Sequence, residues 1–268
     1  MSDGRFDAEL ELALEAAAAA AAILTERAGV EQVRAKLGPS DIVTAVDEAA
    51  ERAIVERIRR VFPTDAIIAE EFSADALRGE RSWIIDPLDG TVNYVHGHPF
   101  ACVSIAFADA AGPAVGVVHA PFLGEVYHAV RGGGAFLNGE RIGVSRVEEP
   151  AAALFATGFP FKIRKGDPTA YFRLVADVLV RSHGIRRAGA AALDLAYVAA
   201  GRVDGFFELG LAPWDVAAGL LLVSEAGGEV SGWPGDADPP LETGRVLVSN
   251  GLLHEWLSER LGEHVPPL

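Results

Sequence analysis

The chain has 268 residues, half of them hydrophobic, which is enough to bury a large core. Its formal net charge of −15 argues against nucleic acid as a partner, because Lys and Arg supply most of the non-specific affinity for phosphate backbones. The single cysteine, Cys102, excludes an intramolecular disulfide and a thiolate metal site, and it favours a reducing cytoplasm.

The N-terminal segment 6–27 is rich in Ala, Leu and Glu and contains neither Gly nor Pro, so we predict a long helix there. Its alanine run, 16–22, follows acidic residues where a signal peptide would need basic ones. No apolar stretch reaches the roughly 18 residues that a membrane-spanning helix requires. We therefore expect a cytoplasmic protein with no membrane partner.

The rest of the first half reads as a second helix followed by short strands. Apolar residues recur at helical spacing from Asp47 to Phe62, and Pro63 ends that helix. Strand-like runs follow at Ala66–Ile68, Trp83–Ile85, Ala101–Ala108, Ala114–Ala120 and Glu125–Val130, and then comes a hairpin with Asn138-Gly139 at its turn.

The second half alternates between helices and strands. We predict helices near 168–182, 191–200, 215–226 and 251–261, with strands near 184–187, 203–208 and 246–249. Antiparallel β structure followed by alternating α/β structure indicates a mixed α+β and α/β fold, a layered sandwich of sheets and helices. We expect one domain over 1–268, with an antiparallel half of about 1–147 and an α/β half of about 148–268.

Two carboxylates, three residues apart, follow one of the predicted strands. Pro87 lacks an N–H, so we expect the strand to end at Asp86 and the chain to turn at Asp89. Both acids then point into one pocket, where their like charges favour a hard cation such as Mg²⁺, or Mn²⁺ in its place. Gly90 and Thr91 open a predicted short helix whose backbone N–H groups would receive a phosphate. The alternative is that these residues only mark turns.

Other acids also stand at the ends of apolar segments. Glu70 follows a short apolar run, and Asp47 and Asp215 stand at the beginnings of predicted helices. Each has a structural alternative, because paired Glu residues usually occupy a solvated loop and an Asp at a helix start is commonly an N-cap. Only the combination of these acids with the first pair points to a metal site.

Several segments together resemble the inositol monophosphatase family. WIIDPLDGTVNYVHG is similar to one family motif, and APWDVAAGLLLVSEAGG is similar to a second. Shorter matching segments occur in the order that the family has, so the resemblance covers nearly all of 35–232. These segments are DIVTAVD, AEE, GGGAFLNG, ATGFPF and GRVDGFFE. It implies a five-layer α-β-α-β-α sandwich, a homodimer, and a phosphomonoesterase that uses two or three Mg²⁺ ions and is inhibited by Li⁺.

The resemblance also implies metal ligands. Glu70, Asp86 and the backbone carbonyl of Leu88 would hold a first ion. Asp86, Asp89 and Asp215 would hold a second, and Glu70 would assist a weaker third ion through water.

Catalytic and substrate-binding roles follow from the same resemblance. The Thr91 hydroxyl, together with Asp47, would orient the attacking water, and Glu70 would take part in catalysis. The residues implied in binding the phosphate or the alcohol are Lys36, Asp89, Gly90, Thr91, Gly189, Ala190, Ala191, Glu208 and Asp215. The family usually has Ser or Thr at position 190, so one hydroxyl contact is missing. Phe72, Val92 and Pro213 also depart from frequent choices.

The implied reaction is hydrolysis of inositol monophosphate, or a similar small sugar phosphate, by metal-activated water. Within the same superfamily, fructose-1,6-bisphosphatase, histidinol-phosphate phosphatase and 3′-nucleotide bisphosphate phosphatase activities are alternatives. A non-enzymatic alternative is a regulatory partner protein. The sequence leaves open the physiological substrate, the native metal, the dimer interface and any regulatory role.

Overall fold

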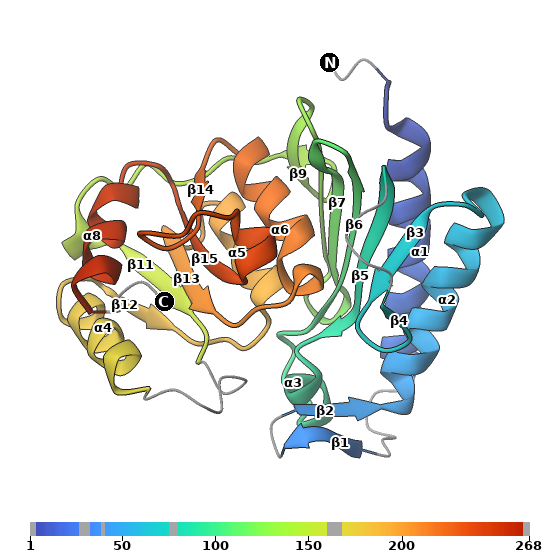
Figure 1. Cartoon of the computed structure of the whole chain (residues 1–268), viewed down its shortest axis with the longest axis horizontal. Coiled ribbons are helices and arrows are strands. Elements are labelled where there is room, and N and C mark those ends of the chain that lie inside the picture. The colour runs from blue at the N-terminus through green and yellow to red at the C-terminus, as the bar shows by residue number, and fades with distance from the viewer. Residues whose placement is uncertain (1–3, 27–32, 39–40, 75–79, 160–167, 265–268) are drawn as a thin grey trace.

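The computed structural model describes residues 4–26, 33–38, 41–74, 80–159 and 168–264. Its helices and sheets stack in five layers, α-β-α-β-α, as the resemblance implied (Figure 1). Helices α1 and α2 form one outer layer, α5 and α6 lie between the two sheets, and α4 and α8 form the other outer layer. Three of the predicted site residues, Asp89, Glu208 and Asp215, lie where the central helices meet both sheets.

The larger sheet has eight strands in the order β10-β9-β8-β7-β6-β5-β3-β4, and only β3 and β5 run parallel. Its strands are β3 (Ala66–Ala69), β4 (Ser73–Ala74), β5 (Arg81–Asp89), β6 (Cys102–Asp109), β7 (Gly112–Ala120), β8 (Glu125–Val130), β9 (Gly134–Leu137) and β10 (Glu140–Arg141). Helices cover both faces of its centre, so β5 is buried at every position after Arg81. A separate two-stranded sheet pairs β1 (Val33–Gly38) with β2 (Asp41–Thr44).

The smaller sheet has five strands in the order β12-β11-β13-β15-β14. They are β11 (Leu154–Thr157), β12 (Gly184–Arg186), β13 (Gly205–Leu209), β14 (Glu229–Ser231) and β15 (Arg245–Ser249). Strand β11 runs parallel to both neighbours, whereas β15 is antiparallel to β13 and β14. The outer helices α4 (Thr169–Val180) and α8 (His254–His264) cover its far face.

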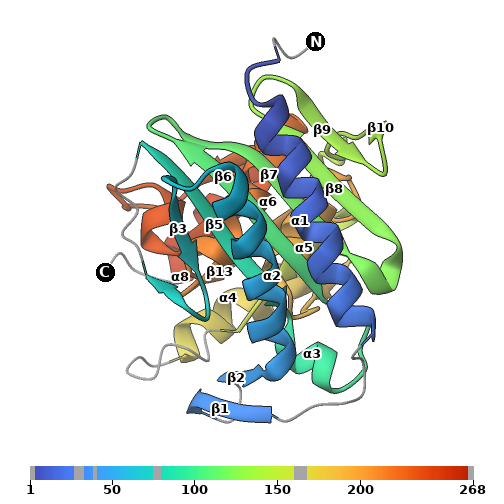
Figure 2. The same cartoon turned by 90° about the vertical axis from the view of Figure 1, so that its right-hand side faces the viewer.

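The N-terminal helices pack tightly against the larger sheet (Figure 2). Helix α1 (Asp7–Glu26) presents its alanine run to α2 (Ala45–Val61) and to the sheet, and Ala13, Ala16 and Ala20 are fully buried. The small side chains therefore serve close packing. No helix in the described ranges is long and apolar enough to cross a membrane.

The central helices α5 (Ala191–Ala199) and α6 (Pro213–Glu225) touch each other and the larger sheet almost backbone to backbone. A Cβ on Gly219 of α6 would lie 2.5 Å from Leu195 of α5, and a Cβ on Gly116 of β7 would lie 2.9 Å from the carbonyl oxygen of Ala218. Glycine at these two positions lets α6 lie close to both neighbours, and this fixes where its N-terminus points.

Replacing Gly219 with alanine should destabilise the fold. The new methyl group overlaps Leu195, and overpacking of this kind costs about 1–3 kcal/mol. Gly262→Ala in α8 is the matched control, because its Cβ would meet only Pro234 at 3.8 Å. The control should instead gain up to about 1 kcal/mol from helix propensity. Urea unfolding of both variants measures the two effects, and equal midpoints would contradict the close packing.

Most predicted elements are confirmed, with ends that differ by a few residues. The hairpin turn has positive φ at Asn138 (50°) and Gly139 (83°), as a two-residue turn requires. One expectation was wrong: β5 does not end at Asp86 but resumes pairing at Asp89, after a register shift that accommodates Pro87. The short strands β1, β2, β4, β11 and β14 were not predicted, because two to six residues give too weak a pattern.

The remaining short helices are α3 (Thr91–Val95), α7 (Pro240–Thr243), η1 (Pro121–Leu123) and η2 (Pro150–Ala152).

Candidate functional site

The irregular end of β5 places two acids in the interior. Asp86 pairs with Ser104 and Asp89 pairs with Cys102, so two residues of β5, Pro87 and Leu88, oppose the single residue Val103 of β6. Asp86 is 2 % exposed and its Oδ1 accepts a hydrogen bond from the Leu88 N–H at 3.0 Å. The prediction that these carboxylates are neighbours is confirmed, although the cause is a bulge and not the end of a strand.

Two of the acids lie at the N-termini of the central helices. Asp89 Oδ2 accepts from the N–H of Ala192, in the first turn of α5, at 2.7 Å. Asp215 is the third residue of α6, and its Oδ2 accepts from the Ala212 N–H at 2.7 Å. These N–H groups and the helix dipoles stabilise negative charge at both acids. Asp215 is therefore not the N-cap, which is Ala212.

Asp47 forms a neighbouring wall of the site. Its Oδ2 accepts from the Thr44 N–H at 2.9 Å, in a capping box in which Thr44 is the N-cap of α2. Its Oδ1 accepts from the Thr91 hydroxyl at 3.1 Å, and that hydroxyl also lies 3.1 Å from the Leu88 carbonyl oxygen. Asp47 therefore contacts both the N-terminus of α2 and Thr91 in the site. The alternative that Asp47 is the N-cap was wrong, because the N-cap is Thr44, three residues earlier.

Glu70 completes the cluster from the turn after β3, where it is half-buried. Burial raises the pKa of Asp86 well above its usual range, and the charges of Glu70, Asp89 and Asp215 raise it further. These four acids, far apart in the sequence, are close enough to repel one another. Glu70, Asp89 and Asp215 therefore lie around Asp86, as the family resemblance implied.

The pKa of Asp47 also reflects this crowding. Burial raises it from 3.8 to about 6 against the hydrogen bonds from Thr44, and the charge of Glu70 adds to the rise. The folded state consequently binds this proton more tightly than the unfolded chain does. The stability that Asp47 contributes is complete below pH 3.8 and is lost as the pH rises through about 6.

We expect Asp47→Asn to remove this pH dependence. In metal-free buffer, the unfolding free energy of the variant minus that of the wild type should increase between about pH 4 and pH 6. Urea unfolding at several pH values in the presence of a chelator measures the difference. A difference that stays flat across this range would show that Asp47 titrates normally.

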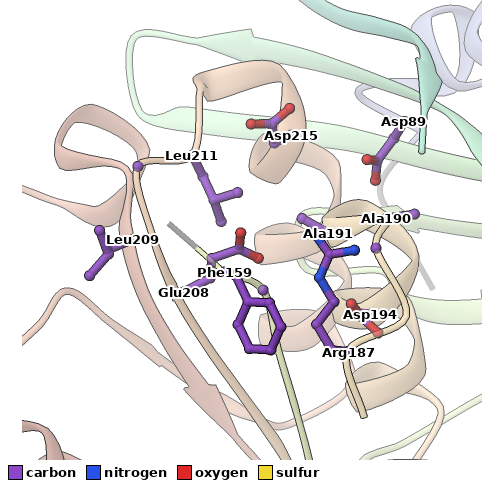
Figure 3. Close-up of a pocket in the computed structure, with 13 residues that line it drawn as sticks. Asp89, Phe159, Arg187, Ala190, Ala191, Asp194, Glu208, Leu209, Leu211 and Asp215 are labelled. Carbon is purple, nitrogen blue, oxygen red and sulfur yellow. The ribbon is translucent and has the colours of Figure 1, made fainter. Parts of the chain in front are cut away.

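A pocket opens beside these acids, between α5, α6 and β13 (Figure 3). Asp89 and Asp215 line one side of it, and Glu208 faces them from β13. The carboxylate of Glu208 occupies the space that a side chain at Gly158 would need, since a Cβ there would lie 2.0 Å from it. Ala191 lines the wall at the start of α5.

Two glycines bend the backbone around this pocket. Gly90 has φ of 91°, and a Cβ there would lie 3.0 Å from the Phe100 carbonyl oxygen and 3.2 Å from Ala190. Gly189 has φ of 95° and precedes α5. Asn93 links the two turns, because its Nδ2 donates to the Phe100 and Ala188 carbonyl oxygens. The turn after β5 and the turn before α5 are thus held together.

The structure therefore brings together nearly all the predicted site residues. The residues that line the cluster or the pocket are Asp47, Glu70, Asp86, Leu88, Asp89, Gly90, Thr91, Gly189, Ala190, Ala191, Glu208 and Asp215. Lys36 falls on β1, but its side chain lies outside the described residues.

Sequence reasoning missed several residues that support or line the site. Glu51 is fully buried, and its carboxylate accepts from the N–H groups of Glu71 and Phe72 at 2.7 and 2.8 Å, which positions the turn that carries Glu70. Cys102 is buried, and its sulfur lies 3.9 Å from Asp89 Oδ2. The sequence did contain one sign that Glu51 is buried, because this acid lies on the apolar face of the predicted helix.

The donor set fits a hard divalent cation. The acids offer carboxylate oxygens, and the Leu88 carbonyl adds a neutral one. In the described part of the chain, three ligand atoms within 4.8 Å of one another occur only at Asp177, Glu263 and His264, on the outer helices. The oxygens of the site acids therefore lie farther apart than this, a spacing that suits Mg²⁺, an ion that keeps several waters and binds through one or two carboxylates. In the outer group, Asp177 already pairs with Arg181.

The chain is similar to known proteins along nearly its whole length. A family model described as "Inositol monophosphatase family" matches residues 7–265 of this chain. Nus factor SuhB of Pseudomonas aeruginosa is 44 % identical over 265 residues, which cover 96 % of this chain and 97 % of the relative. Inositol-1-monophosphatase of Synechocystis sp. is 42 % identical over 257 residues, with coverages of 94 % and 88 %. The solved structure of inositol monophosphatase from Anabaena (Nostoc) sp. has a TM-score of 0.85 and 41 % identity, and the match covers 97 % of this chain and 98 % of that one.

Proposed function

Because this chain belongs to the inositol monophosphatase family, we propose that it is a Mg²⁺-dependent phosphomonoesterase that hydrolyses inositol monophosphate or a similar small sugar phosphate. The observation that carries the proposal is the convergence of Asp86, Asp89 and Asp215 with Glu70 beside a pocket. Four mutually repelling acids in the interior are costly unless a cation offsets their charge.

The proposed ligands follow from this arrangement. Glu70, Asp86 and the Leu88 carbonyl would hold one ion, and Asp86, Asp89 and Asp215 would hold another. A bound divalent ion supplies water of lowered pKa and stabilises charge on the departing oxygen. Mn²⁺ offers the same coordination chemistry and is the alternative metal.

The chain's own groups position the substrate. The chain turns left-handed at Gly90, at the start of α3, and the N–H groups of Gly90 and Thr91 are proposed to receive the phosphate. Asp47 accepts a hydrogen bond from the Thr91 hydroxyl, which leaves the oxygen of that hydroxyl free to orient a water. Gly189, Ala191 and Glu208 would contact the alcohol. Ala190 is buried and apolar, so it offers no hydroxyl contact.

A second candidate function comes from the relatives named Nus factor SuhB. A role as such a factor would rest on protein contacts and would not require turnover. The intact set of acids favours catalysis, because a pure binding role gives no reason to keep mutually repelling buried carboxylates. Binding of purified transcription machinery by a protein without phosphatase activity would favour the second candidate.

Released phosphate from a panel of substrates tests the proposal. The panel comprises inositol monophosphate, fructose 1,6-bisphosphate, histidinol phosphate and a 3′-nucleotide bisphosphate, each with Mg²⁺, with Mn²⁺ and with a chelator. Metal-dependent release from the inositol ester, inhibited by Li⁺, is the expected result. Release that is unaffected by the chelator would overturn it. The homodimer stays a prediction, which sedimentation of the purified chain checks.

A further inference from the structure

One buried acid near the pocket has no part in the chemistry described above. Asp194 lies on α5, is 3 % exposed, and lines the pocket together with Arg187 and Glu208 (Figure 3). No hydrogen bond from the described part of the chain reaches its carboxylate. A nearly buried acid that accepts no hydrogen bond from the chain is costly unless a water or a ligand in the pocket supplies one.

The surroundings of Asp194 increase that cost. Helix α5 is otherwise apolar on all sides that the neighbouring layers cover, and the charges of Glu208 and Asp89 repel Asp194. Burial and this repulsion raise its pKa well above the usual range, while Arg187 opposes the rise. An apolar residue or Asn would fit the helix with less strain, so the fold itself does not explain the carboxylate.

Asp194 lines the pocket beside Arg187 and Glu208, which are far in sequence from the bulge of β5. The charges that raise the pKa of Asp194 come from Glu208, a proposed alcohol contact, and from Asp89, a proposed metal ligand. Under the proposed function, Asp194 therefore faces the part of the pocket in which the leaving alcohol would lie.

A positively charged side chain already lies in the same part of the pocket. Arg187 lies over the ring of Phe159, with its guanidinium carbon 5.5 Å from the ring centre. The positive φ of Gly189 lets the chain pass beneath it, because a Cβ there would lie 2.7 Å from Arg187 Nη1. A positively charged substrate group would be repelled by this guanidinium. Neutral hydroxyl groups, which donate hydrogen bonds to carboxylates, are the better match.

We propose that Asp194, with Glu208, is a specificity-determining residue that accepts a hydrogen bond from a hydroxyl of the leaving alcohol, so that the enzyme selects phosphate esters of polyols. The inference rests on the proposed function and names its substrate class. Cyclitol and sugar phosphates carry hydroxyls next to the ester oxygen, whereas simple aryl phosphates carry none. The discrimination comes from leaving the buried carboxylate unpaired when the hydroxyl is missing.

Steady-state kinetics of the full chain, in saturating Mg²⁺, test this with three esters. These are inositol 1-phosphate, phenyl phosphate and phosphoethanolamine, assayed with the wild type, Asp194→Asn and Asp194→Ala. We expect the ratio of kcat/KM for the inositol ester to that for phenyl phosphate to fall about tenfold or more in Asp194→Ala. The change should appear in KM, and Asp194→Asn, which keeps one acceptor oxygen, should lie between the two. Equal losses on both esters, or a loss confined to phosphoethanolamine, would overturn the inference.

Thermal unfolding separates a binding role from a structural one. Because Asp194→Asn removes a buried, repelled charge, we expect its Tm to equal or exceed that of the wild type, as happens when a residue is kept for function. Asp7→Asn, at the exposed first turn of α1, is the control. A Tm well below the wild type's would assign Asp194 to the fold.

If the wild type releases phosphate from none of the esters, the proposed function fails and calorimetry decides the inference. Inositol that binds the wild type but not Asp194→Ala would support the polyol contact independently of turnover. Equal binding to both, or none to either, would overturn it.

Discussion

Asp215→Asn and Asp89→Asn should each abolish metal-dependent phosphate release while the fold stays intact. Each substitution removes one negative charge from the set proposed to hold the cations. Each Asn still offers a carbonyl oxygen to the helix N–H that the acid accepts from, at Ala212 or Ala192. The loss in kcat should exceed about a hundredfold, the upper range for partners that only support a metal ligand.

The matched control is Asp177→Asn on α4, which lies in the outer acidic group. It loses a partly exposed ion pair with Arg181, which contributes little to stability, so its turnover should equal the wild type's. Circular dichroism and Tm confirm that each variant folds. Turnover that survives in a folded Asp215→Asn, or is lost in Asp177→Asn, would assign the metal chemistry to a different place.

Mg²⁺ should stabilise the wild type and leave Asp86→Asn unaffected. Asp86 is 2 % exposed, and three neighbouring acids repel it, so a cation relieves a large unfavourable interaction. With Mg²⁺ at about 100 times its Kd, the gain is about 2.7 kcal/mol, or several degrees in Tm for a chain of this size.

In chelator the order should reverse, with Asp86→Asn more stable than the wild type. Its carbonyl oxygen can keep the hydrogen bond from the Leu88 N–H, and the repulsion is gone. Thermal unfolding of both proteins, with Mg²⁺ and with chelator, gives four Tm values. The wild type should have the higher Tm in Mg²⁺, and Asp86→Asn should have the higher Tm in chelator. Parallel shifts in the two proteins would mean that Mg²⁺ acts elsewhere, for instance at the outer acidic group.

The acids of the site could be predicted from sequence because each stands beside a regular element. Asp86 and Asp89 follow the apolar run 83–85, and Asp215 lies in the first turn of an apolar helix, so their neighbours already indicate their burial. The chain reversals that bring them together are not visible in local pattern. Their convergence could be predicted only through the family resemblance.

Other features depend on tertiary contacts that leave little trace in sequence. Strand β5 continues past Pro87 because the register shift against β6 accommodates it, which no residue next to the proline indicates. Strand β11 has four residues and takes its identity from parallel neighbours on both sides. Asp194 is a single acid within an apolar helix, and only the pocket beside it shows that its burial has a cost.

Both halves of the chain contribute to the pocket and to the acids beside it. The bulged strand β5 and the turn before α3 come from the first half, whereas Glu208, Arg187 and α5 come from the second. Under the proposed function, the first half would set the reaction and the second would set which alcohols are accepted. Grafting the second half of one relative onto the first half of another should then transfer substrate preference without rebuilding the hydrolytic centre, provided that Asp215, the acid supplied by the second half, is retained.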